Sequence, residues 1–227
     1  MKSFYLYLLF LLAFVSLEAQ VNFKIGYELD YFNSSAQSCI VDQYNEEFSF
    51  LENGEFMPSL RFMNGVNLGV SYRTRFSRIE LGWHLISREL DAFGTIEATD
   101  STATQAYDLG IRYRRSGFQL GYEFIIQKFG IGATLNRDVF SMATKGSPIK
   151  VFSRQPTYTT QFHISYQLYQ SDRISLVLRP YYTLFYEELN FEPLISEMNI
   201  SPIKSTVGDV PYSFGLTVIF YNGPQEW

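Results

Sequence analysis

The chain is poor in cysteine, in histidine and, beyond its first residues, in long apolar runs. Its single cysteine, Cys39, excludes an internal disulfide framework, and its two histidines form no cluster of metal ligands with that cysteine. No stretch after residue 19 approaches 18 consecutive apolar residues, so we expect no helical membrane span. The net charge of −5 gives no general support for nucleic-acid binding, and no glycine-rich phosphate loop follows a strand. We therefore predict no cofactor, no metal site and no nucleic-acid partner.

Residues 1–19 have the pattern of a secretory signal peptide. A short basic start, Met1-Lys2-Ser3, precedes an almost unbroken apolar run from Phe4 to Leu17, and Ala19 offers a small residue before the cleavage point. At about 14 residues this run is short against the roughly 20 that a helix needs to span a bilayer. We expect cleavage, export from the cytoplasm and one mature domain over residues 20–227.

What the chain has in excess is aromatic side chains, and they recur with a period of two. The aromatic content is 18%, with 17 tyrosines and 21 phenylalanines. Residues 212–220 show the pattern clearly, with aromatic and aliphatic side chains on one face and small or polar ones on the other. Because side chains of a strand point alternately to its two faces, each such segment is a strand with one apolar face. The pattern recurs at 21–31, 56–73, 79–85, 107–113, 118–136, 158–168 and 174–186.

The number of strands depends on residues 125–128, where the apolar residues change from even-numbered to odd-numbered positions. A β-bulge there keeps 118–136 as one strand and gives eight strands, whereas a turn gives nine. Long connections at 32–55, 88–104, 138–157 and 187–210 alternate with short turns at 75–77, 114–117 and 170–172. This alternation favours the bulge, because outer-membrane barrels have long outer loops, short periplasmic turns and both ends on the periplasmic side. We predict an all-β, antiparallel up-and-down transmembrane barrel of eight strands, with ten as the alternative.

The small and charged residues indicate which face lies inside. Nine strand glycines share the polar face, where a narrow barrel has least room: Gly26, Gly65, Gly69, Gly82, Gly110, Gly121, Gly130, Gly132 and Gly215. Charges on that face are matched in number, which predicts a network in a polar lumen: Lys24, Glu28, Asp30, Arg61, Arg73, Glu80, Asp108, Arg112, Glu123 and Arg179. So many charges do not suit the core of a soluble barrel, since unpaired buried ions cost several kcal/mol. Eight strands leave a lumen that side chains fill, so we expect no wide pore.

Aromatic residues on the apolar face are expected to anchor the barrel at the membrane interfaces: Tyr31, Tyr72, Trp83, Tyr107, Tyr113 and Tyr186. The predicted outer loops are acidic, and their acidic residues are Asp42, Glu46, Glu47, Glu52, Glu55, Asp91, Glu97, Asp100, Asp138, Glu187, Glu188, Glu192, Glu197 and Asp209. The predicted turns carry basic residues instead: Arg75, Arg78, Arg114, Arg115 and Arg173. The acidic rim either attracts divalent cations or a basic partner, or is a solvated surface. The first long loop also contains three large apolar residues, Phe48, Phe50 and Leu51. We expect them either to form a contact patch or to pack over the barrel mouth.

The exported N-terminus, the strand count and two segments together resemble a known family. The segments are Gly65-Val66-Asn67-Leu68-Gly69-Val70-Ser71-Tyr72 and Arg179-Pro180-Tyr181-Tyr182. The mature chain resembles the small outer-membrane β-barrel proteins of Gram-negative bacteria, especially the barrel-only type common in Bacteroidota, whose signal ends are similar to Ala19-Gln20. The resemblance implies location in the cell outer membrane and contact with its lipid, lipopolysaccharide and the barrel assembly machinery. One departure is the end of the chain, where six residues from Asn222 follow the last strand although many such barrels end on its aromatic residue.

We expect a monomeric, non-enzymatic protein with a structural or surface-interaction role and a filled lumen. One alternative is a narrow channel for ions or small solutes, whose conductance would depend on Arg112 or Glu123. A second is a secreted soluble barrel that binds a hydrophobic ligand. A lipid-modifying enzyme is the least favoured, because His163, Ser165 and His84 face the predicted lumen and no acid partner is recognisable at a suitable spacing.

Overall fold

The computed structural model describes residues 20–49, 52–97, 104–145, 148–171, 173–201 and 207–222. The predicted signal peptide, residues 1–19, lies outside the described residues, as do Phe50 and Leu51. No helix in the described ranges is long and apolar enough to cross a membrane.

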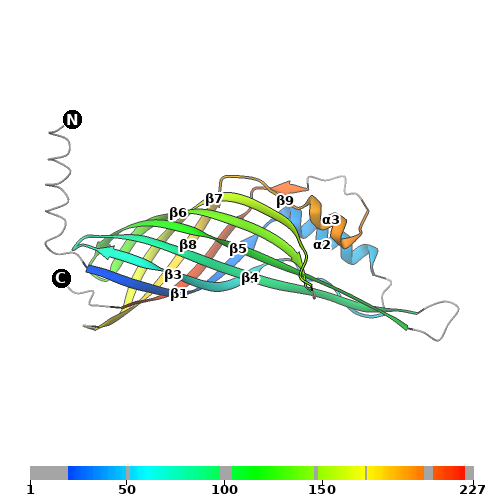
Figure 1. Ribbon diagram of the computed structural model, residues 1–227, viewed down its shortest axis with the longest axis horizontal. Helices are drawn as coiled ribbons and strands as arrows, with labels where there is room; N and C mark the ends of the chain where they lie inside the picture. Colours follow the sequence, from blue (N-terminus) through cyan, green and yellow to red (C-terminus); the bar gives the residue numbers. More distant parts are fainter. Residues whose placement is uncertain are drawn as a thin grey trace.

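Eight long strands of the described chain close into a barrel (Figure 1). They are β1 (Gln20–Asn33), β3 (Phe62–Arg73), β4 (Ser77–Glu97), β5 (Thr104–Ile126), β6 (Phe129–Thr144), β7 (Val151–Gln170), β8 (Ile174–Phe185) and β11 (Tyr212–Asn222). Each pairs antiparallel with the strands before and after it, and β1 closes the ring by pairing with both β3 and β11. The predicted antiparallel eight-stranded barrel is therefore confirmed.

The remaining described elements gather at one end of the barrel, which we call the loop end (Figure 1). They are α2 (Ser35–Glu47), β2 (Glu52–Glu55), β9 (Leu189–Asn190), α3 (Glu192–Met198) and β10 (Gly208–Asp209). Strand β2 pairs with the far part of β4, and β9 pairs with β10. The opposite end, where β3–β4, β5–β6 and β7–β8 are joined by short connections, we call the turn end.

Side chains alternate between the two faces of the barrel wall as the sequence indicates. In β1, Val21 is 70% exposed and its neighbour Asn22 is 1% exposed, and the alternation continues to Asp30. Apolar side chains such as Phe118 and Ile131 point outward, whereas Thr134 and Ser213 are buried inside. The barrel thus has an apolar exterior and a polar interior.

The connection between β5 and β6 differs from the sequence prediction. The parity change at residues 125–128 is a turn, and Gln127 has the left-handed φ of 56° that tight hairpin connections use. The predicted turn at 114–117 does not exist, because these residues lie in the middle of the 23-residue β5 and pair with both β4 and β6. The total of eight strands is still right, because the false turn adds one strand to the count and the missed turn removes one. The predicted loop at 138–157 is correspondingly shorter, since β6 continues to Thr144 and β7 begins at Val151.

Glycines on the inner face let neighbouring strands approach closely. A Cβ on Gly65 would lie 1.8 Å from the Leu85 carbonyl oxygen, and one on Gly69 would lie 2.3 Å from that of Leu81. A side chain at either position would force β3 away from β4. Gly110 departs from the predicted set, because its Cβ would meet Asp91 and Lys145 at the outer surface.

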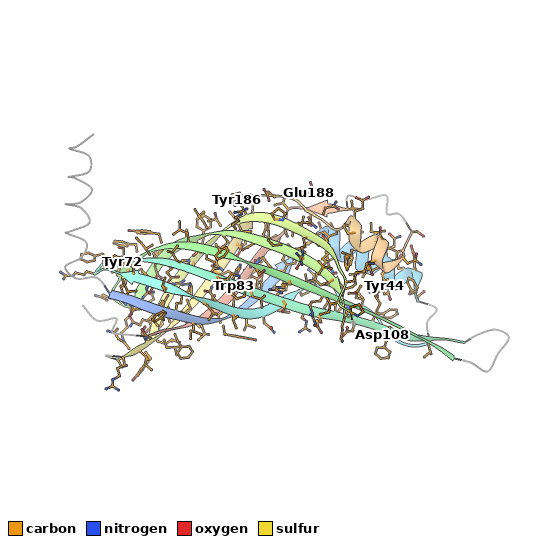
Figure 2. The ribbon with its side chains drawn as sticks, viewed as in Figure 1. Tyr44, Tyr72, Trp83, Asp108, Tyr186 and Glu188 are labelled. Carbon is orange, nitrogen blue, oxygen red and sulfur yellow. The ribbon has the colours of Figure 1, made fainter. Side chains whose placement is uncertain are left out.

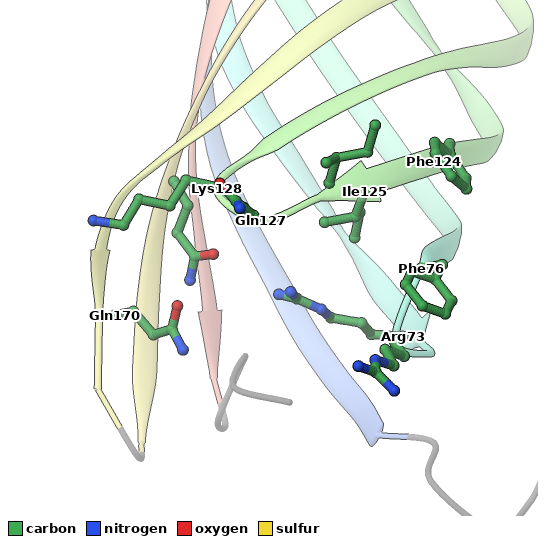
Figure 3. A pocket seen from close by; sticks show the side chains of 10 residues that line it. Arg73, Phe76, Phe124, Ile125, Gln127, Lys128 and Gln170 are labelled. Atoms are coloured by element: carbon green, nitrogen blue, oxygen red, sulfur yellow. The ribbon is translucent and has the colours of Figure 1, made fainter.

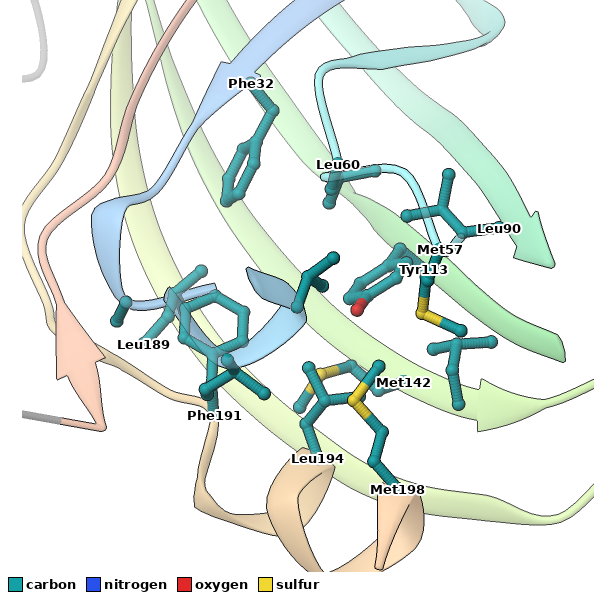
Figure 4. Close-up of a cluster of buried hydrophobic side chains, with 14 of the residues drawn as sticks. Phe32, Met57, Leu60, Leu90, Tyr113, Met142, Leu189, Phe191, Leu194 and Met198 are labelled. Atoms are coloured by element: carbon teal, nitrogen blue, oxygen red, sulfur yellow. The ribbon is translucent and has the colours of Figure 1, made fainter. Parts of the chain in front are cut away.

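A hydrophobic cluster fills the mouth of the barrel at the loop end (Figure 4). Helix α2 contributes Ile40, Val41 and Tyr44, and α3 contributes Leu194 and Met198. They pack with inward-facing strand residues, among them Phe32, Ile86, Tyr113, Phe140 and Met142. Phe48 also packs against this cluster, as one of the two sequence interpretations proposed. The loop end is therefore closed by a conventional apolar core, which the strand pattern alone does not predict.

Candidate functional site

The lumen contains two clusters of buried charges, one above the other along the barrel. The cluster nearer the turn end consists of Lys24, Arg78, Glu80, Glu123 and Arg179, whose side chains are at most 4% exposed. Arg179 binds Glu80 through two hydrogen bonds of 2.8 Å, and the Lys24 ammonium lies 2.9 Å from the same carboxylate. Arg78 donates to Glu123 at 2.8 Å. Such bidentate, charge-assisted contacts offset much of the cost of removing these ions from water.

Two hydroxyl groups add further hydrogen bonds to this cluster. The Tyr221 hydroxyl accepts from Arg179 at 3.1 Å and from Arg78 at 3.3 Å, and donates to Glu80. Ser165 donates to Glu123. Tyr221 also lies under the Arg78 guanidinium, which is 4.3 Å from the ring centre.

The second cluster, nearer the loop end, consists of Glu28, Asp30, His84, Arg115 and Asp138. His84 lies between two carboxylates, with Nε2 2.9 Å from Asp138 and Nδ1 3.4 Å from Glu28. Arg115 lies 3.3 Å from Asp30 and 3.8 Å from Asp138. These side chains are at most 1% exposed, and the Tyr181 hydroxyl donates to Asp30 at 2.9 Å.

The structure places most of the predicted lumen residues inside the barrel and three of them elsewhere. Lys24, Glu28, Asp30, Glu80, Glu123 and Arg179 belong to the two clusters, and Arg73 is buried at the turn end. Arg61 lies before β3 at the loop end, where it donates to Asn33 at 2.6 Å. Asp108 and Arg112 are wrong as lumen residues. Asp108 is exposed, and Arg112 pairs with Glu89 while both side chains remain more than a third exposed.

Three charged lumen residues were missed because the sequence interpretation placed them in turns or loops. Arg115 was assigned to the false turn at 114–117, and Asp138 was assigned to an acidic loop. Both side chains are buried inside the barrel. Arg78 was likewise assigned to a turn, but it is the second residue of β4 and is buried. The outward-facing residues Phe118, Leu120, Tyr122 and Phe124 were the signal, because their alternation, carried back past residue 116, places Arg115 on the inner face.

Most of the predicted interface aromatics lie on the exterior (Figure 2). Tyr31 packs between Phe62 and Phe214 on neighbouring strands, with ring centres 5.1 and 4.7 Å away. Tyr72 lies near the turn end, Tyr186 is well exposed, and Trp83 lies in the middle of the wall (Figure 2). Tyr113 is wrong, because it is fully buried in the loop-end cluster and accepts a hydrogen bond from Gln37. The side chain of Tyr107 lies outside the described residues.

The buried histidines and Ser165 do not form a hydrolytic site. Ser165 donates to the Glu123 carboxylate, and His163 lies 3.9 Å from that carboxylate, beyond hydrogen-bonding distance. His84 belongs to the other cluster. A nucleophilic serine requires a base within hydrogen-bonding reach of its hydroxyl. Neither ring nitrogen of His163 has a hydrogen-bond partner in the described part of the chain, so this histidine is not positioned to activate Ser165. Within the described ranges, no group of three or more His, Cys, Asp or Glu could hold a metal ion.

Polar contacts fasten the two helices over the loop end. The Asp209 carboxylate accepts hydrogen bonds from the Ser34 and Ser35 hydroxyls and from the backbone N–H groups of Ser35 and Ala36, at the start of α2. At the other end of α2, Glu47 accepts from the Gln43 side chain and from the Ser201 backbone N–H, and these bonds lower the pKa of Glu47. Helix α2 is therefore held at both of its ends by polar contacts.

A pocket of about 600 Å³ opens at the turn end (Figure 3). Its polar lining residues are Arg73, Arg75, Gln127, Lys128, Gln167 and Gln170. Phe76, Phe124 and Ile126 give it an apolar side. Figure 3 shows Arg73 and Gln170 across the opening from one another, with Gln127 and Lys128 at the β5–β6 turn.

No protein-family model and no curated protein sequence matches the chain. Among solved structures, it is similar to Ail, the attachment invasion locus protein of Yersinia pestis, with a TM-score of 0.48, 9% identity and coverage of 91% of this chain and 99% of that one. For Neisserial surface protein A the TM-score is 0.46, with 10% identity and coverage of 90% and 98%. For the outer membrane protease OmpT of Escherichia coli it is 0.38, with 8% identity and coverage of 90% and 95%. Likenesses at this level identify neither a family nor an activity for this chain.

Proposed function

We propose that this chain is a monomeric outer-membrane barrel with a structural or surface-interaction role. The observation that carries the proposal is the inverted distribution of side chains, apolar outside and ionic inside. Large apolar residues around the wall are more than half exposed, including Phe23, Phe118, Ile131 and Ile164. A soluble protein rarely exposes so continuous an apolar surface, whereas a bilayer requires one.

The closed ring of hydrogen bonds supports the same proposal. Lipid offers no partner for backbone N–H and C=O groups, so only helices and closed barrels satisfy them within a membrane. Pairing of β1 with both β3 and β11 leaves the barrel without an open edge. Membrane lipid, lipopolysaccharide and the barrel assembly machinery are the partners that this location implies, and the Bacteroidota-type barrels remain the family that we propose.

The filling of the lumen favours an interaction role over transport. Charged clusters occupy the barrel interior, and the apolar core under α2 and α3 covers its loop end. A soluble carrier of a hydrophobic ligand would need an apolar lumen, but the described lumen beneath the loop-end core is lined mainly by ions, hydroxyls and amides, with one small apolar cluster of Val177, Ile219 and Tyr221. The part of the protein that can meet a partner outside the membrane is then the loop end, with the exposed sides of its two helices.

Heat modifiability in isolated outer membranes tests the proposal. A closed barrel resists unfolding by detergent at room temperature, so the unheated chain should run at a different position on a denaturing gel than the boiled chain. We expect this shift, in the outer-membrane fraction. An unshifted chain in the soluble periplasmic fraction would contradict the proposal and favour the soluble barrel.

A further inference from the structure

The pocket at the turn end offers positive charge and hydrogen-bond donors, without a carboxylate among its described lining residues. Arg73, Arg75 and Lys128 line it, and no Asp or Glu is among its described lining residues. Its polar groups come from three directions: Arg73 ends β3, Lys128 lies in the β5–β6 turn, and Gln167 lies on β7. Donors arranged around a space in this way suit a tetrahedral anion better than a flat carboxylate.

A buried donor points to a ligand independently of the charges. Gln167 is 7% exposed, and its side-chain Nε2 makes no hydrogen bond within the described part of the chain. Leaving a buried amide N–H unpaired costs about 1–3 kcal/mol, so such groups are normally satisfied. Gln167 lines both the pocket and a small hollow that continues inward to Arg78 and Ser165. An acceptor oxygen in the pocket would satisfy this donor.

Two guanidinium groups also lie on adjacent strands at this end of the barrel. Arg73 and Arg78 face one another directly across the β3–β4 pair, which is an unfavourable arrangement for like charges. An anion bound beside Arg73 would be attracted by both guanidinium groups.

The apolar side of the pocket suggests where that anion comes from. Phe76, Phe124 and Ile126 are about half exposed or more on the outer wall beside the opening. A membrane lipid could therefore lay its chains on the wall and its headgroup in the pocket. We propose that the turn-end pocket binds the phosphate group of an anionic phospholipid. The inference rests on the proposed function, which turns this end toward the phospholipid leaflet.

Lipid retention by the purified, folded full-length mature barrel tests the inference. The protein is placed in detergent micelles that contain phosphatidylglycerol or the diacylglycerol with the same chains, and bound lipid is counted by native mass spectrometry. The variants are Arg73→Gln and Lys128→Gln, the second in an exposed turn where it should not disturb folding. Arg173→Gln is the matched control, because it removes the same charge from the exposed β7–β8 turn at the same end without lining the pocket. A parallel sample replaces the lipid with inorganic phosphate.

We expect the wild type to retain phosphatidylglycerol in preference to diacylglycerol. Arg73→Gln and Lys128→Gln should each weaken that retention by about tenfold, and Arg173→Gln should not. Equal retention of the two lipids, or an equal loss in Arg173→Gln, would overturn the inference. Phosphate binding that Lys128→Gln weakens, without any lipid preference, would show a soluble phosphate as the source and overturn the lipid assignment. The gel shift is recorded for each sample, so a chain that does not form a barrel at all counts against the proposed function instead.

Discussion

At the scale of single residues, each buried charge in the lumen depends on partners that are distant in the sequence. Glu80 receives donors from Lys24, Arg179 and Tyr221, which lie on three different strands. Removing one partner from a buried ion pair leaves the other charge without compensation, and this costs more than the pair contributes.

Glu80→Gln should therefore destabilise the barrel strongly. It keeps the shape of the side chain but removes the carboxylate that Lys24 binds and leaves Arg179 with Glu123 alone, at a cost of about 3–5 kcal/mol in the free energy of unfolding. Urea unfolding in lipid vesicles measures the change. Glu89→Gln is the control, because it breaks a half-exposed pair with Arg112 and should cost less than about 1 kcal/mol. Equal effects of the two substitutions would contradict this, because the buried lumen pairs would then contribute no more to the free energy of unfolding than an exposed pair.

The sequence predicts which residues face the interior wherever the alternation of apolar and polar residues is unbroken. Lys24, Glu28 and Asp30 were assigned correctly to the interior because β1 alternates without interruption. Arg115 was not, because Arg114-Arg115-Ser116-Gly117 is polar and looks like a turn. Asp138 was not, because it was placed in the predicted loop at 138–157. Their burial depends on pairing with Asp30 and His84 from other strands, which no local pattern contains.

At the scale of elements, the covering of the loop end depends on how α2 is fastened. The helix begins at Ser35 after the N-cap Ser34, and Asp209 adds a carboxylate there from a segment 174 residues further along the chain. Negative charge at a helix N-terminus satisfies free N–H groups and complements the helix dipole. The hydrophobic contacts of Ile40, Val41 and Tyr44 then keep the helix over the mouth.

Asp209→Ala should loosen α2 without affecting the barrel. The loss of the capping contacts is expected to lower the free energy of local opening by about 0.5–2 kcal/mol. Hydrogen exchange should show faster exchange of the α2 amides and unchanged exchange in β1 and β11. Asp42→Ala, which removes an exposed carboxylate from the same helix, should leave both unchanged. Faster exchange throughout the barrel in Asp209→Ala would mean that the helix and the barrel unfold as one unit.

The helices themselves were not predicted, and the reason is physical. Residues 35–47 bury only one side, and that side meets inward-facing residues of distant strands such as Tyr113, Phe140 and Met142. Tyr113 looks lipid-facing when the parity of β5 is taken from residues 107–113 alone. The strand pattern of a barrel therefore predicts its wall, but not what fills its mouth.

At the scale of the whole molecule, two kinds of side-chain packing close the lumen. Ion pairs fill it between the wall strands, and an apolar core covers it at the loop end. We expect the purified barrel to show no conductance steps above the bare bilayer in planar-membrane recordings. Reproducible steps that change in Glu123→Gln would establish a passage through the turn-end cluster and contradict the filled-lumen account.

If the apolar face of the wall lies in lipid, Trp83 reports it directly. Trp83 lies in the middle of the wall between Leu68 and Phe118 on the adjacent strands. In a Trp227→Phe variant, which leaves Trp83 as the only tryptophan, fluorescence is measured in vesicles whose lipids carry bromine at chosen depths. We expect strong quenching by bromine deep in the acyl chains and little quenching by aqueous iodide. Quenching by iodide with none from brominated lipid would contradict it.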